Sequence, residues 1–284
     1  MAKRICFVTA GPSKWASSRM RGQWIADRLD NAIVASADQP LPDADVYIWI
    51  KGFDLDIIKE RKEARHIWDV CDPIWWWHPR ECWEMAHTVS TIVASNPALA
   101  FDFRSWCGKE PLVIPDRLLL DHYPLKRKHV HADPVRYIWY GAAQNRIGLF
   151  GVIASLERLA ANGVKLQLTI CDDNPKDRWG LTDMFPIYHA DWSVEKENEI
   201  ISAHDIALVP PYPGAWGLVK SNNKSLTAWA CGLPATDGMD YDSLARLATE
   251  TEYRKSEAKA GFDLLKTSYR IEQSVKEWKA IINE

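Results

Sequence analysis

Short apolar runs alternate with amphipathic stretches along nearly the whole chain, and this alternation limits the possible folds more than any other feature of the sequence. A short apolar run is typical of a strand that is buried on both faces. The order strand, helix, strand is typical of a parallel sheet covered by helices, because a crossover must join two parallel strands. The sequence therefore predicts an α/β fold.

The apolar runs form two series, and each series predicts one parallel sheet. The first series predicts strands at residues 5–9, 32–35, 46–50, 66–70, 91–95 and 112–114. The second series predicts strands at residues 135–140, 165–171 and 205–209. Apolar residues at helical spacing predict helices at about 18–29, 54–63, 97–106, 148–162, 222–231 and 253–284.

A polar and basic segment with a proline at each end, residues 124–134, separates the two series. Such a segment is typical of a connection between domains, and a chain of 284 residues is long enough for two. We therefore expect an N-terminal domain over residues 1–125 and a C-terminal domain over residues 134–265.

The composition is that of a protein that folds in water. Hydrophobic residues make up 47% of the chain and charged residues 26%, and the net charge is −3. These values exclude intrinsic disorder, and no stretch approaches the roughly 18 uninterrupted apolar residues of a membrane span. An acidic total also disfavours binding to nucleic acid through bulk charge. The six cysteines form no C-x-x-C pair and no secretory signal is visible, so a reduced, cytoplasmic protein is expected.

Several common motifs of cofactor and catalytic sites are missing from the sequence. It contains no G-x-G-x-x-G fingerprint, no Walker phosphate loop and no G-x-S-x-G elbow. The eight histidines show no spacing typical of metal ligands, so no metal site is predicted.

A loop rich in lysine and small polar residues leads into the expected helix 222–231, directly after the expected strand 205–209. It contains Lys220, Ser221, Asn222, Asn223 and Lys224. A helix N-terminus has unpaired amide donors and a positive dipole end, so with two lysines the segment suits a diphosphate. It also suits solvated charges beside an ordinary N-cap, and spacing alone leaves both interpretations open.

A second loop of this kind follows the strand 135–140. Gly141, Asn145 and Arg146 lie between that strand and the next expected helix. Ligands of open parallel sheets bind at the carboxyl ends of the strands, where both loops are expected to lie.

Tryptophans are concentrated in residues 72–83, a segment that follows the expected strand 66–70. They form either a hydrophobic lid or interface, or a platform that stacks on a sugar ring or a nucleobase of an acceptor. Asp69, Asp72 and His78 lie nearby as candidates for an acid or base, although each residue type is more often a structural hydrogen-bonding group.

Six segments, in the same order along the chain, resemble motifs of the retaining group-1 family of nucleotide-sugar glycosyltransferases, which have the GT-B fold. In the first half, residues 18–22 resemble the S-x-R-x-R entry to the first helix, 68–72 the Y-D-x-D-D segment and 113–116 the I-P-N turn. In the second half, 137–141 are similar to the first strand and glycine loop, 204–210 to A-D-I-A-L-x-P, and 220–234 to K-S-N-x-K…E-x-x-x-x-G-x-P.

This resemblance implies a GT-B architecture, with two Rossmann-like parallel-sheet domains, an interdomain cleft and a last helix, about 266–284, that packs on the first domain. It implies transfer of a sugar from a nucleotide-diphosphate sugar, a UDP-sugar in the first place, to a hydroxyl acceptor, with retention and without a required metal or cofactor. The expected catalytic residues are Lys220, Lys224 and Asp72. The expected donor-binding residues are Gly141, Asn145, Arg146, Ser221, Asn222, Asn223 and Thr227. The expected acceptor-side residues are Arg19, Arg21, Asp69, Trp75, Trp76, Trp77 and His78.

The sequence departs from the family pattern at two positions. Where the family has a pair of glutamates, this chain has Val219 and Thr227. A threonine hydroxyl can hydrogen-bond the ribose of a donor, but without the charge of a carboxylate. The change puts the affinity or the identity of the donor in doubt.

The acceptor is open at this stage. A glycan or a cell-envelope intermediate is the first expectation. Phage-type DNA with hydroxymethylated bases is the alternative, and the small size of the chain, its tryptophan-rich segment and the basic cluster Lys126, Arg127 and Lys128 favour it. A further alternative is a non-catalytic module that binds a nucleotide sugar or a glycan, which the two missing glutamates would allow.

Overall fold

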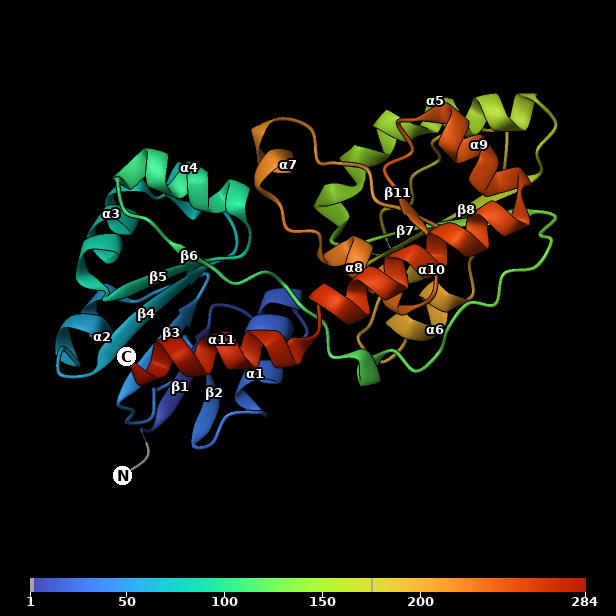
Figure 1. Cartoon of the computed structure of the whole chain (residues 1–284). Helices are drawn as coiled ribbons and strands as arrows, with labels where there is room; N and C mark the ends of the chain where they lie inside the picture. The colour runs from blue at the N-terminus through green and yellow to red at the C-terminus, as the bar shows by residue number, and fades with distance from the viewer. Residues whose placement is uncertain (1–2, 175) are drawn as a thin grey trace. The chain divides into compact units, whose positions relative to one another are not determined.

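The computed structural model describes residues 3–174 and 176–284, which divide into two compact units. The first unit runs to Leu119 and also includes Leu218–Ser221 and Tyr269–Glu284. The second unit contains Leu120–Gly217 and Asn222–Ser268. Each unit is a parallel sheet with helices on both faces (Figure 1).

The first sheet has six parallel strands in the order β2-β1-β3-β4-β5-β6. The strands are β1 (Ile5–Thr9), β2 (Ala32–Ser36), β3 (Val46–Ile50), β4 (Arg65–Val70), β5 (Thr91–Ala94) and β6 (Leu112–Val113). Since β1, β3 and β4 are neighbours, the loops at their carboxyl ends meet at one edge of the sheet.

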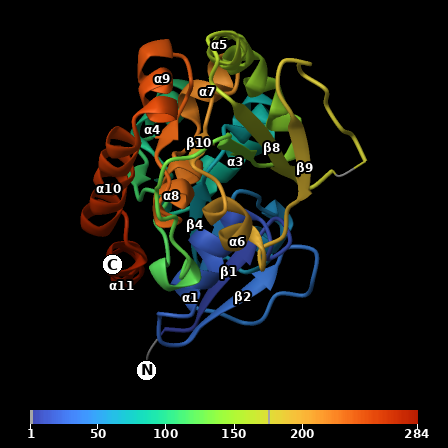
Figure 2. The same ribbon diagram turned by 90° about the vertical axis from the view of Figure 1, so that its right-hand side faces the viewer.

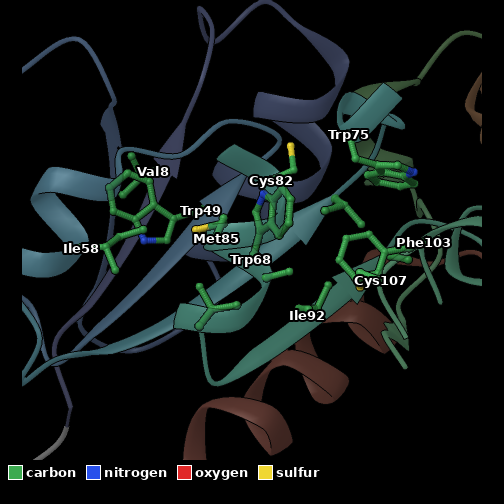
Figure 3. Close-up of a cluster of buried hydrophobic side chains, with 14 of the residues drawn as sticks. Val8, Trp49, Ile58, Trp68, Trp75, Cys82, Met85, Ile92, Phe103 and Cys107 are labelled. Carbon is green, nitrogen blue, oxygen red and sulfur yellow. The ribbon is translucent and has the colours of Figure 1, made fainter. Parts of the chain in front are cut away.

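Aromatic side chains dominate one face of the first sheet. Trp49 of β3 and Trp68 of β4 are partners in register and are fully buried, and Figure 3 shows Met85 beside them. Three helices cover this face: α2 (Leu55–Glu60), α3 (Pro79–Thr88) and α4 (Pro97–Cys107). Burial of large aromatic rings removes much apolar surface from water, so these side chains stabilise the sheet.

The other face of the first sheet is covered by the helices before β2 and at the end of the chain. The first begins as a π-helix, η1 (Ser18–Gln23), and continues as α1 (Trp24–Ala26). The last helix, α11 (Ile271–Asn283), lies against α1, and Trp278 packs edge-on against Phe7 of β1 (Figure 1).

The second sheet has five parallel strands in the order β11-β10-β7-β8-β9. They are β7 (Val135–Tyr140), β8 (Leu166–Asp172), β9 (Ile187–Asp191), β10 (Ile206–Leu208) and β11 (Ala235–Thr236). The helices α5 (Phe150–Ala161) and α9 (Tyr241–Thr249) cover one face, and α6 (Glu197–Ser202), α8 (Asn223–Ala230) and α10 (Thr251–Ser268) lie on the other (Figure 2).

The expected α/β class and the two parallel sheets are confirmed, and every strand expected from an apolar run is present. Two strands have no counterpart among the expected ones. β9 is an edge strand whose residues are all partly exposed, and β11 has only two residues, so neither makes an apolar run. The expected helix 148–162 is preceded by a 3-10 turn, η4 (Ala143–Leu149), and the expected tail helix is two helices, α10 and α11.

The polar segment 124–134 belongs to the second unit. The backbone N–H and C=O of Leu125 both pair with the Asn198 side chain, and the Arg127 N–H donates to the Cys231 carbonyl. These hydrogen bonds tie the segment along α6 and the end of α8, which polarity and proline content alone do not reveal. Across the described residues, no helix combines the length and apolar character needed to span a bilayer.

Candidate active site

Two lysines and a carboxylate meet at the carboxyl edge of the first sheet. Lys51 directly follows β3, and Asp72 lies two residues after β4. The Asp72 carboxylate accepts from Lys51 Nζ at 2.7 Å and from Lys220 Nζ at 2.8 Å, one lysine on each oxygen. Asp72 is buried, whereas both lysine side chains are about one-third exposed (31% and 35%).

The two lysines determine the charge state of Asp72. Burial alone would raise the pKa of this carboxyl, but the charges of Lys220 and Lys51 outweigh burial and lower it. Burial alone would lower the pKa of Lys51, but the charge and hydrogen bond of Asp72 outweigh burial, so the pKa of Lys51 is raised. Asp72 and Lys51 are therefore both charged at neutral pH.

Arg21 and Asp69, both expected on the acceptor side, form a buried ion pair. Arg21 donates to the two oxygens of Asp69 at 2.7 and 2.6 Å, and to Asp116 and the Ile114 carbonyl at 2.9 Å each. Burial lowers the pKa of Arg21, but the two carboxylates offset this and raise it. The pair joins the ends of β4 and β6 to η1 beneath the surface, since Asp69 is fully buried.

Arg19 is also buried and lies on the same π-helix as Arg21. Its guanidinium donates to the Lys14 carbonyl at 3.2 Å and stacks over Trp24 at 5.6 Å from the ring centroid.

The tryptophan-rich segment divides into a buried and an exposed part. Trp75 is fully buried against Phe103, whereas Trp76 is 37% exposed and Trp77 is 49% exposed. The indole N–H groups of Trp75 and Trp76 both donate to one oxygen of Asp102, at 3.0 and 2.9 Å. The segment is thus anchored on α4 with two rings at the surface. His78 occupies the N-cap position of α3 without a side-chain capping bond, and it is exposed.

In the second unit, Lys224 lies at the carboxyl edge of the sheet beside the loop that follows β7. Its ammonium is 4.7 Å from the Trp139 ring centroid, and its backbone carbonyl accepts from the Tyr140 hydroxyl at 2.5 Å. Gly141 has φ +151°, and a Cβ at this position would lie 2.6 Å from Lys224 Nζ. Any larger residue at position 141 would therefore push the lysine away.

Arg146, which was expected to bind the donor, is buried and forms hydrogen bonds to other residues of the second unit. It donates to both oxygens of Asp172 at 2.5 and 2.6 Å, and to the carbonyls of Asn174 and Asp177. It fixes the loop after β8 to η4. Asn145 precedes it in η4 and is partly exposed.

The remaining donor-side candidates lie at the start of α8. Asn222 occupies the N-cap position of the helix without a side-chain capping bond, and Asn223 is the first helical residue. Ser221 precedes both and is partly exposed. Thr227 follows Lys224 by three positions, which places the two on one face of the helix. Thr227 is buried, with 8% of its surface exposed.

Val219 packs in an apolar cluster of the first unit, and its carbonyl accepts from the Asn96 amide at 2.9 Å. A glutamate at position 219 would be buried without a partner in this environment, so the valine suits its surroundings.

No known protein family and no curated protein matches the chain by sequence. Solved structures do resemble it. One is titled "alpha-glucosyltransferase (AGT) in complex with UDP", with a TM-score of 0.71, 12% identity and full coverage of both chains. A second, an alpha-glucosyltransferase with UDP and a 13-mer DNA containing a central A:G mismatch, has a TM-score of 0.70, 12% identity and the same coverage. A third is WaaG, a glycosyltransferase involved in lipopolysaccharide biosynthesis, with a TM-score of 0.58, 14% identity, and coverage of 95% of this chain and 98% of that one.

The chain has the GT-B glycosyltransferase fold. At 12–14% identity the likeness to these enzymes extends to the fold, so the roles of individual residues must be argued from the geometry of this chain.

Two residues near Asp72, Lys51 and Trp15, were not among the site residues expected from the sequence. Trp15 lies on the first loop of the sheet at 45% exposed, and Lys51 Nζ is 5.5 Å from its ring centroid. Lys51 has φ +68°, which is unusual for a residue other than glycine. A signal was present in the sequence, because Lys51 and Gly52 interrupt an apolar run at the expected carboxyl end of a strand.

No group of three or more His, Cys, Asp and Glu side chains suited to a metal ion occurs within residues 3–174 and 176–284.

Proposed function

We propose that this chain is a glycosyltransferase that moves a sugar from a UDP-sugar to a hydroxyl acceptor. The whole-chain likeness to UDP-bound enzymes of the GT-B fold supports the reaction class and the donor. The observation that carries the proposal for this chain's own residues is Lys224, which lies beside Gly141 at the carboxyl edge of the second sheet. Ligands of parallel α/β sheets bind at that edge.

The two lysines would act on the leaving group. As the bond between sugar and diphosphate breaks, negative charge develops on the diphosphate, and cations fixed nearby stabilise it. Lys224 and Lys220 supply such charges, together with the amide donors of Asn222 and Asn223 at the start of α8. Since these lysines provide the positive charge that the departing diphosphate needs, we expect turnover without an added metal.

Asp72 would position Lys220 rather than exchange a proton. Its lowered pKa keeps it ionised at neutral pH, so it cannot serve there as a general acid. The Lys220 ammonium has three donors and places one of them on Asp72, which holds the lysine in one direction. We also expect retention at the anomeric carbon, which the configuration of the product tests directly.

A glycan or cell-envelope intermediate remains the first candidate for the acceptor, and DNA is the second. The likeness to a glucosyltransferase bound to DNA favours the second. Two residues of the basic cluster weigh against it. Arg127 pairs with Asp205 at 2.5 Å, and Lys126 donates to the Tyr123 carbonyl, while burial lowers the pKa of Lys126.

A salt series separates the two acceptors. Each phosphate that the protein neutralises makes binding to DNA weaker as salt rises, whereas a neutral glycan shows little dependence. Turnover of hydroxymethylated duplex DNA with a steep dependence of its KM on salt would select DNA, and turnover of a glycan with a flat response would select the first candidate.

Release of UDP from a panel of UDP-sugars tests the proposed reaction. Lys224→Ala should lower kcat/KM by roughly 30- to 1,000-fold, because loss of one charge-assisted contact in the transition state costs about 2–4 kcal/mol. Lys165→Ala is the matched control in the same unit, since Lys165 is 75% exposed in a surface pair with Asp133. Near-normal turnover of Lys224→Ala would contradict the assigned role. Absence of UDP release from every donor would favour a binding module over an enzyme.

A cytoplasmic location is part of the proposal. The six cysteines are unpaired, and all but Cys71 are buried, as is typical of proteins in a reducing compartment.

A further inference from the structure

A cavity of about 210 Å³ with a mixed polar and apolar lining lies in the first unit at the carboxyl ends of β1 and β2, next to η1. It lies on the β2 side of β1, whereas Lys51 and Asp72 follow β3 and β4 on the other side. No residue of the candidate active site lines it. Its polar side chains are those of Thr9, Ser13, Ser18, Gln23 and Ser36.

Three of the side chains that line the cavity donate hydrogen bonds to the protein. The Thr9 hydroxyl donates to the Ala35 carbonyl at 3.4 Å, and the Ser18 hydroxyl donates to the Gly11 carbonyl at 3.0 Å. The Gln23 amide nitrogen donates to Asp27 at 2.6 Å. The Thr9 and Ser18 hydroxyls have each committed their one hydrogen and retain oxygen lone pairs, and the Gln23 amide retains its oxygen and one N–H. The cavity therefore suits a ligand whose hydroxyl groups donate hydrogen bonds.

The π-helical winding of η1 brings two of these groups together. Ser18 and Gln23 are five residues apart, and the Trp24 N–H donates to the Arg19 carbonyl in the five-residue pattern of a π-helix. In an α-helix with 3.6 residues per turn, positions five apart would diverge by roughly 140°. The wider turn instead lets both line one cavity. Single π-turns are frequent at functional sites.

The other residues that line the cavity have no polar side chain, and no charged side chain is among the described lining residues. Pro12, Val34 and Ala35 complete the lining together with Gly11. Of the described residues that line the cavity, none is Lys, Arg, His, Asp or Glu, so a phosphate or carboxylate would find no cation. A volume of about 210 Å³ exceeds that of single waters, at roughly 30 Å³ each, and is below the roughly 300–1,000 Å³ of sites for drug-sized ligands.

We infer that this cavity is a subsite for one uncharged saccharide ring of the acceptor, whose hydroxyl groups donate to the oxygens of Thr9, Ser18 and Gln23. The inference rests on the proposed function and names its acceptor class, a glycan. The apolar wall contacts the C–H face of the ring. The subsite shares one edge of the sheet with Lys51, because β3 is the neighbour of β1.

Direct binding by saturation-transfer NMR and titration calorimetry tests the subsite. The probes are glucose, N-acetylglucosamine and their disaccharides. Cytidine, 5-hydroxymethylcytidine and inorganic phosphate are tested in parallel as ligands of other classes. We expect a saccharide to bind and the double variant Thr9→Val/Gln23→Leu to bind it roughly tenfold or more weakly, since each lost neutral hydrogen bond is worth several-fold. Thr9→Ser keeps the hydroxyl and should retain wild-type affinity, and thermal unfolding of each variant checks that it folds.

The inference is overturned if no saccharide binds, if the double variant binds saccharide as tightly as the wild type, or if a nucleoside or phosphate binds in place of saccharides. UDP release by the wild type separates this result from the proposed function. Release of UDP without saccharide binding refutes the subsite alone, and saccharide binding without release of UDP from any donor refutes the proposed function alone.

Discussion

Replacing Asp72 with asparagine removes one charge from between two lysines. In the wild type, Lys51 and Lys220 each contact this carboxylate, at 2.7 and 2.8 Å. In Asp72→Asn, two ammonium groups remain side by side without their counter-ion. At about 4 Å, each charge pair is worth about 4 kcal/mol at an effective dielectric constant near 20. The variant should therefore be less stable and hold Lys220 less firmly.

The size of the effect lies between that of a buried and an exposed ion pair. Loss of one partner from a buried pair costs about 3–5 kcal/mol, and an exposed pair contributes about 0–1 kcal/mol. Because Asp72 is buried but both lysines are about one-third exposed, we expect a loss of about 2 kcal/mol. For a chain of this size that corresponds to a fall of about 4–8 °C in the melting temperature.

The effect should depend on pH in a defined direction. The pKa of Asp72 in the folded chain lies below its value of about 3.9 in an unfolded chain, so its contribution is present above that pH and is lost as the pH falls through the folded value. Lys51 has a raised pKa, so its contribution is present below about pH 10.4 and is lost as the pH rises through the folded value. The difference between wild type and Asp72→Asn should thus be largest at about pH 5–10.

Thermal unfolding of both proteins from pH 3 to pH 10 measures this difference. Asp43→Asn is the control, because Asp43 is 83% exposed in its pair with Arg61 and should change stability by less than about 0.5 kcal/mol. Adding Lys220→Met to Asp72→Asn should restore part of the stability, since it removes one of the two uncompensated charges. Equal melting temperatures of wild type and Asp72→Asn at pH 7, or a difference that persists undiminished at pH 3, would refute the reasoning.

Three further predictions concern packing, the exposed rings and the donor. Gly261→Ala should lower stability by about 1–2 kcal/mol, because a Cβ at this position of α10 would overlap the Trp229 ring, and Trp229→Ala in the same chain should relieve the clash in a thermal unfolding cycle. Trp75→Ala should destabilise the chain by about 3–5 kcal/mol as a buried ring, whereas Trp77→Ala should leave melting unchanged and raise the acceptor KM; unaltered acceptor KM would assign Trp77 no part in binding. Thr227→Val should raise the donor KM about two- to tenfold if its hydroxyl meets the ribose, and an unchanged KM would place that hydroxyl away from the donor.

Much of the architecture follows from local pattern. The apolar runs predicted the strands of both sheets, and the helix after Lys220 begins within one residue of its expected position, because burial on both faces and helix caps leave a mark on neighbouring residues. The loops after β7 and before α8 could also be placed at the carboxyl edge of a sheet from chain order alone.

Burial of individual polar side chains could not be predicted in this way. Arg21 and Asp69 were expected on the acceptor side and Arg146 at the donor, and the structure places all three in buried ion networks. The sequence of a motif that contains an arginine is the same whether the guanidinium binds a ligand or pairs with a carboxylate from another strand. The partner's identity depends on which strands are neighbours.

The sequence by itself determined that this chain forms two parallel sheets with lysine-rich and glycine-containing loops at strand ends, because apolar periodicity and turn residues act over a few positions. Only the tertiary structure decided that Asp72 meets Lys220, 148 positions away, and that Lys51 completes the group. It likewise decided that Ser18 and Gln23 face one cavity with Thr9. The contacts of Asp72 depend on the order of the strands, which arises from pairing between segments that are distant along the chain. The placement of Ser18 and Gln23 depends on the five-residue hydrogen bond of the π-helix, which apolar spacing at 3.6 residues per turn does not reveal.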